Sequence, residues 1–172
     1  GKNRMNKLQF LFAAFLMAAC STRTVKNAAS LQGRLFPNGI YRHQVHVRTI
    51  DAPAGVPQEM DLHGVVSTSD SEIKVVGLSP IGFTLFRLTE NRATGQVQKE
   101  FFVDAVKKGE PFVMKFYGVL KEMLLTTDRS PHQVSGNTTF DFENPDDHQI
   151  PQKIRIDNPR FKIEVDVTGY EI

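Results

Sequence analysis

The sequence predicts an α+β fold, in which one major amphipathic helix forms the lid of a curved antiparallel β-sheet shaped as an incomplete barrel. Most of the chain after residue 39 alternates apolar and polar residues with a period of two, which is typical of strands with one buried face. A single segment, residues 111–125, changes to a helical period. An antiparallel sheet with one buried face needs a cover, and this helix is the natural candidate.

The first 20 residues have the composition of an export signal. Lys7 follows Met5, and residues 8–19 are almost wholly apolar. A basic start, a short apolar stretch and small residues before the cut follow one another in secretory signals. About 12 apolar residues would form a helix of about 18 Å, which is too short for a bilayer core of about 30 Å. Residues 1–19 are therefore predicted to be a cleaved signal peptide.

The only cysteine, Cys20, follows two alanines at the end of the apolar stretch. The run from Phe15 to Cys20 resembles the lipobox of bacterial lipoproteins, in which the cysteine is acylated and the leader removed. The resemblance implies that lipidated Cys20 attaches the protein to a membrane of the bacterial cell envelope. Ser21 implies sorting to the outer membrane, facing the periplasm. An ordinary signal peptide with an incidental cysteine is the alternative.

Charge gives no support for a nucleic-acid partner. The whole chain has a net charge of +2, but the leader holds three of its 21 basic residues and none of its 19 acidic residues. Removal of the leader would leave a net charge of about −1, and the remaining basic residues are spread among acids. With Cys20 acylated, the mature chain has no thiol for a disulfide or a cysteine metal site.

The chain after Cys20 divides into a tether and one domain. Residues 20–38 are polar and mixed, which predicts a lipid-anchored tether, and residues 39–172 have the usual size of a single domain. Short turns rich in glycine, proline and polar residues separate the expected strands. These strands lie around residues 45–47 and at 60–64, 72–77, 83–89, 96–102, 137–142, 152–157 and 161–168.

The expected helix begins near Pro111, which suits a first helical turn because its missing N–H leaves no hydrogen bond unmade there. Gly118 lowers the intrinsic stability of the helix by roughly 1 kcal/mol, so packing must stabilise it. A polar link, residues 126–133, follows. We expect one side of the helix to pack on the concave face of the sheet, namely Phe112, Phe116, Leu120 and Leu124.

No motif for catalysis or cofactor binding is present. The sequence lacks the serine-hydrolase, zinc-protease, phosphate-loop and dinucleotide fingerprints. His43 and His46 are three residues apart on an expected strand, so they point to opposite faces. We expect no catalytic residue, no metal and no cofactor, and therefore no enzyme.

The remaining signal is apolar, with 13 phenylalanines and no tryptophan in the chain. Phenylalanine and methionine on inward positions suit either a filled core or a cavity for a lipid, because both types pack without needing a hydrogen-bond partner. The sequence leaves both alternatives open. The candidate cavity residues are Leu62, Leu85, Phe112, Phe116, Leu120, Leu124, Ile163 and Val165.

The order of three consecutive segments carries a second resemblance. A strand at 73–77 leads into the motif of Leu78, Pro80 and Gly82, and a strand at 83–88 follows; near the end of the chain, residues 151–156 precede a strand at 161–165. This order resembles the LolA/LolB-like group of lipoprotein carriers and receptors, especially its uncharacterised lipoprotein branch. The resemblance implies a half-barrel at residues 39–172 with a helical lid and an apolar cavity for acyl chains. Known members ferry or receive lipoproteins between membranes.

Two functions are therefore expected. The first is an outer-membrane-anchored periplasmic lipoprotein that binds an acyl chain, a lipid or a lipoprotein, with a role in its transport. The second is a structural or accessory envelope lipoprotein with a filled core and no ligand. A continuous apolar void of several hundred Å³ favours the first function, and normal packing density favours the second.

Overall fold

Nine strands pair into one continuous antiparallel sheet in the computed structural model, which describes residues 33–50 and 57–172. Two helices lie between the fifth and sixth strands. The elements are β1 (Gly39–Thr49), β2 (Glu59–Thr68), β3 (Glu72–Leu78), β4 (Thr84–Asn91), β5 (Val97–Phe101), α3 (Asp104–Lys108), α4 (Glu110–Leu125), β6 (His132–Ser135), β7 (Thr138–Pro145), β8 (Pro151–Asn158) and β9 (Phe161–Glu171).

The expected fold class, an α+β incomplete barrel with a helical lid, is wrong. The described residues form a single open sheet, β5-β4-β3-β2-β1-β9-β8-β7-β6, and the fold is nearly all-β. The fold-class prediction relied too much on the one segment with a strong helical period, which makes up only a small part of the chain. Consecutive hairpins, together with the pairing of β1 with β9, place every strand in the same sheet.

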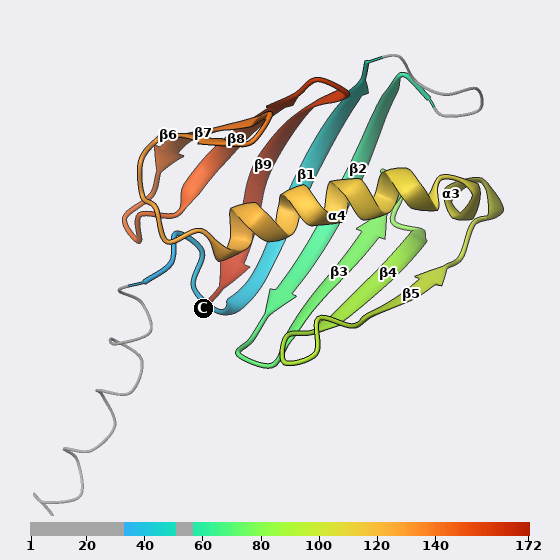
Figure 1. Cartoon of the computed structure of the whole chain (residues 1–172), viewed down its shortest axis with the longest axis horizontal. Coiled ribbons are helices and arrows are strands. Elements are labelled where there is room, and N and C mark those ends of the chain that lie inside the picture. Colours follow the sequence, from blue (N-terminus) through green and yellow to red (C-terminus); the bar gives the residue numbers. More distant parts are fainter. Residues whose placement is uncertain (1–32, 51–56) are drawn as a thin grey trace, which may run out of the picture. The chain divides into compact units, whose positions relative to one another are not determined.

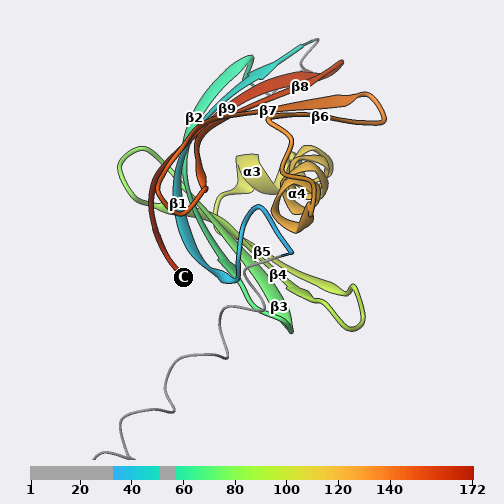
Figure 2. The ribbon, with the colours of Figure 1, turned by 90° about the vertical axis from the view of Figure 1, so that its left-hand side faces the viewer.

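Two meanders make up this sheet. Strands β1 to β5 follow one another in space, and so do β6 to β9. The first and last strands join them, with Tyr41 opposite Tyr170 and Val47 opposite Ile163. As a result, β5 and β6 are the two edges of the sheet, and the helical link between them crosses the concave face (Figures 1 and 2).

Alternating burial confirms most of the expected strands. In β9, the clearest case, apolar residues from Phe161 to Val167 are buried at every second position and the charged residues between them are exposed. Strand β6 was missed, because only one of its four residues is even half-buried. It pairs with β7 through a tight turn at Gly136, whose φ of 55° favours glycine.

The domain begins earlier than expected. Leu35 and Phe36, which were assigned to the tether, are buried in the core, and the backbone N–H of Leu35 donates to the carbonyl oxygen of Thr126 at 3.1 Å. The short helix α3 was not predicted either, since none of its five residues is buried.

Helix α4 confirms the expected helix, with Pro111 in its first turn. Its buried stripe is Val113, Tyr117, Leu120, Met123 and Leu124. The expected inward side is therefore fully buried in the second half of the helix, at Leu120 and Leu124, and partly buried against the core in the first half. Phe112 and Phe116 are only half-buried and lie at the border of the stripe.

One charged side chain anchors this helix to the sheet. Glu90 of β4 is 3% exposed, and it accepts hydrogen bonds from Tyr117 Oη at 2.7 Å and from Lys121 Nζ at 2.6 Å. Burial raises the pKa of Glu90, but the hydrogen bonds from Lys121 and Tyr117 and the positive charges of Lys121 and Arg92 outweigh it, so the pKa lies below its usual value. The carboxylate thus holds the second half of α4 in place.

Replacement of Tyr117 by phenylalanine should lower the free energy of unfolding by about 1.5–3 kcal/mol, because a buried hydrogen bond to a charged group is lost. Lys121→Met is the companion variant. Lys121 is 37% exposed, but Glu90 is buried, so this change leaves a buried carboxylate without its counter-charge and should cost at least as much as Tyr117→Phe. Urea unfolding measures both variants, and wild-type stability in both would contradict this account of the anchor.

Candidate functional site

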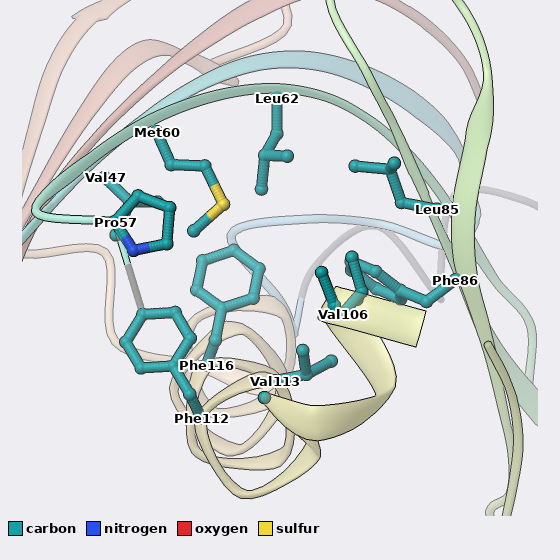
Figure 3. A pocket seen from close by; sticks show the side chains of 12 residues that line it. Val47, Pro57, Met60, Leu62, Leu85, Phe86, Val106, Phe112, Val113 and Phe116 are labelled. Carbon is teal, nitrogen blue, oxygen red and sulfur yellow. The ribbon is translucent and has the colours of Figure 1, made fainter. Parts of the chain in front are cut away.

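An apolar pocket of about 190 Å³ lies between the sheet and the first half of α4 (Figure 3). None of the twelve residues that line it has a charged or hydrogen-bonding side chain. They are Val47, Pro57, Met60, Leu62, Leu85, Phe86, Ala105, Val106, Gly109, Phe112, Val113 and Phe116. The pocket can therefore receive only apolar groups without leaving a polar group unpaired.

The walls of the pocket come from opposite layers of the fold. Met60 and Leu62 project from β2 toward Phe112 and Phe116 of α4 (Figure 3). Val106 of α3 adds a third side. The half-buried phenylalanines of α4 thus face this pocket, which explains why they fall outside the fully buried stripe.

Two surface hollows are larger, at about 400 and 390 Å³. Lys115 and Arg160 line the first, and Glu122 and Asp128 line the second. Both hollows have charged side chains in their walls, so the apolar pocket is the stronger candidate site for an apolar ligand.

A second cavity of about 30 Å³ lies beside the apolar pocket. Leu62, Phe86 and Phe116 line both spaces. Gly64 and Gly77 lie opposite one another on β2 and β3 and also line the small cavity, where they present no side chain to fill it.

The structure brings together six of the eight predicted cavity residues. Leu62, Leu85, Phe112 and Phe116 line the apolar pocket. Of the other four, Leu120 and Val165 line the small cavity, which Leu62 and Phe116 also line. Leu124 and Ile163 lie in the packed core, each at 1% exposure. The sequence could not separate these groups, because filled and hollow regions use the same residue types.

His43 of β1 is the polar group of this region that the cavity prediction missed. It is 3% exposed, it lines the small cavity, and its Nε2 atom has no hydrogen-bond partner among the described residues. Burial lowers the pKa of His43 to about 4, so the ring is neutral at pH 7. The burial of His43 could have been predicted from the sequence, because alternate residues of a strand share one face and His43 alternates with Tyr41, Val45 and Val47, which are buried.

Two other histidines, His46 and His132, lie in exposed ion pairs. His46 contacts Asp61 at 2.8 Å and His132 contacts Asp141 at 2.6 Å, in exposed pairs across neighbouring strands. Within residues 33–50 and 57–172, no three His, Cys, Asp or Glu side chains gather as metal ligands.

The motif of Leu78, Pro80 and Gly82 ends β3 and continues into the turn before β4, and none of the three lines the pocket. The N–H of Gly82 donates to the carbonyl of Ser79 at 2.8 Å, and its φ of 90° requires glycine. Ile81 and Phe83 in this turn are 80% and 70% exposed. Phe83 was predicted to begin a strand, but it lies in this exposed apolar turn.

No family model matches the chain, and a search of curated proteins finds no relative. The resemblances to lipoproteins and to the LolA/LolB-like group therefore stay predictions. Cys20 and the expected leader lie outside the described residues. Along the described part of the chain, no helix is both long and apolar enough to cross a membrane.

Alanine in place of Gly64 and of Gly77 should have different effects on stability. A methyl group at Gly64 would lie 3.7 Å from His43 Cβ, an ordinary contact, so Gly64→Ala should be neutral or stabilise the fold by up to about 1 kcal/mol. A methyl group at Gly77 would overlap the buried ring of Phe86, so Gly77→Ala should cost about 1–3 kcal/mol. Urea unfolding measures both, and equal losses would show that the space beside Gly64 is closed.

The free energy of unfolding should fall as the pH drops from about 6.5 to about 4. In this range His43 takes up a proton in the unfolded chain, whereas in the folded protein its buried ring has a lowered pKa and stays neutral. Above pH 6.5 the ring is neutral in both states and contributes no pH dependence. The full shift corresponds to about 3 kcal/mol.

His43→Leu should remove this component from the pH dependence of the unfolding free energy. His46→Leu, on the exposed face of the same strand, is the control and should keep it. If the two variants show the same slope between about pH 6.5 and 4.5, His43 is not the group responsible.

Proposed function

We propose that this protein is a lipoprotein that binds an acyl chain in the pocket between the sheet and α4. Lipidated Cys20 anchors it to the outer membrane, with the domain in the periplasm. It moves or holds its hydrophobic ligand and makes or breaks no bond. The observation that carries the proposal is a pocket that the packed core leaves open and whose lining side chains are all apolar.

The size of the pocket sets the size of the ligand. A cavity of about 150 Å³ is enough to bind a benzene-sized apolar guest, whereas sites for drug-sized molecules occupy about 300–1,000 Å³. At about 190 Å³, the pocket fits one segment of a single chain rather than a whole lipid. The ligand is therefore proposed to insert one acyl segment and to leave the rest outside.

Entry beside α3 fits this proposal. Ala105 and Val106 of α3 line the pocket, while none of the five residues of that helix is buried. A segment with so few buried contacts can move at small cost. The second half of α4, held by Glu90, would stay in place.

The accessory lipoprotein with a filled core is the second candidate. It is favoured by the pocket volume, which is below the several hundred Å³ expected of a carrier. Such a protein would use its surface rather than its interior, and it would bind no free acyl chain. Ligand binding therefore separates the two candidates.

Leu85→Trp should abolish binding of a fluorescent fatty acid and cost less than about 1 kcal/mol of stability, because the added volume enters existing space. Leu88→Trp on the same strand is the matched control. Leu88 is 1% exposed and does not line the pocket, so that change should cost about 1–3 kcal/mol and leave binding in the folded fraction intact. If both variants are equally destabilised and the wild type binds no fatty acid, the acyl-chain proposal fails and the accessory lipoprotein remains as the candidate function.

Cys20→Ala tests the anchor separately. The variant should be uncleaved or should appear in the soluble periplasmic fraction, because the acylated cysteine is the proposed attachment. Membrane fractionation of cells that express each form provides the measurement. Unchanged tight association of the variant with membranes would show that another feature anchors the chain.

A further inference from the structure

His43 is a buried polar group beside a small cavity whose other lining residues are apolar, apart from His63, which is exposed. Its Nε2 atom is shielded from solvent and has no hydrogen-bond partner among the described residues. Buried polar groups in folded proteins are almost always hydrogen-bonded, since leaving one unpaired costs stability. The exceptions call for an explanation, and here the ring borders a cavity.

The backbone around His43 is arranged to leave this space open. His43, Gly64, Gly77 and Phe86 lie opposite one another in a row across β1, β2, β3 and β4. Paired residues in antiparallel strands share a face of the sheet, so all four face the same side. The two glycines between the rings of His43 and Phe86 provide the floor of the cavity.

This space is the inner neighbour of the acyl pocket. Leu62, Phe86 and Phe116 line both, so only side chains separate them. A chain that fills the apolar pocket would place its inner end against these three residues. A rotation of their side chains would bring that end to the small cavity.

We propose that His43 binds an uncharged polar group, a hydroxyl or a carbonyl, at the inner end of the ligand. This inference rests on the proposed function and names the ligand class as an aliphatic chain that carries such a group. A neutral imidazole has one nitrogen that donates and one that accepts, so either group can pair with it.

Size and charge exclude other head groups at this end. A cavity of about 30 Å³ has room for a group about the size of one water molecule, which excludes a phosphate or a sugar. Among the described residues no lysine or arginine lines it, and His63, which does, is exposed on the opposite face of β2, so a carboxylate would lie there without a compensating charge.

The test compares hexanol with hexane as competitors that displace fluorescent N-phenylnaphthylamine from the full-length chain. The two competitors share the same alkyl chain and differ in one hydroxyl group. His43→Leu should lower the ratio of hexanol affinity to hexane affinity by about 5- to 10-fold, the usual effect of one neutral hydrogen bond. His46→Leu should leave the ratio unchanged, because that side chain lies on the other face of the same strand.

A second measurement on the wild-type chain does not depend on how the variants fold. The Nε2 resonance of His43, followed by nitrogen NMR, should shift on addition of hexanol and should stay in place on addition of hexane. If His43 serves only to pack β1, its resonance should respond in the same way to hexanol and to hexane.

The outcomes separate this inference from the proposed function. If both competitors bind, and neither the affinity ratio nor the resonance of His43 distinguishes them, the inference is wrong and the acyl pocket stands. If neither competitor displaces the probe from wild type, the proposed function fails, and the role of His43 fails with it.

Discussion

The pairing of β1 with β9 is the constraint on which the rest of the structure depends. It joins residues at the two ends of the domain, from Ile40 opposite Glu171 to Thr49 opposite Phe161. Without it, the chain would consist of two separate meanders, each with one apolar face and no shared partner. Such a contact closes a long loop, which costs entropy that only the combined core can offset.

The position of α4, and with it the pocket, follows from this pairing. With β5 and β6 at opposite edges of the sheet, the link between them has to cross the concave face, where a 16-residue helix spans about 24 Å. Glu90 holds the second half of that helix close to the sheet. Over the first half, Phe112 and Phe116 meet β2 across a space that they do not fill.

The sequence predicted those elements whose periodicity is strong, such as β9 and α4, and missed those that bury little, such as β6 and α3. The fold class was wrong because alternation marks strands without showing how many share one sheet. The pairing of β1 with β9 is non-local, so no segment of the sequence signals it.

The candidate site was predictable in its residue types but not in its shape. Leu62 and Phe116 do line the pocket, whereas Leu124 and Ile163 are equally apolar and pack into the solid core. Volume depends on how side chains from distant strands fit together, which a single sequence does not show. His43 has the parity of a buried residue, yet its role depends on Gly64 and Gly77, which only strand pairing brings beside it.

Photo-crosslinking is the most direct test of acyl-chain binding in the pocket. A fatty acid with a diazirine on its chain would be irradiated with the full-length protein, and the labelled residues would be mapped by mass spectrometry of peptides. We expect labels on Met60, Leu62, Phe112 and Phe116, which face one another in the pocket. Labels confined to exposed apolar residues such as Ile81 and Phe83 would contradict binding in the pocket, because the chain would then contact only the surface.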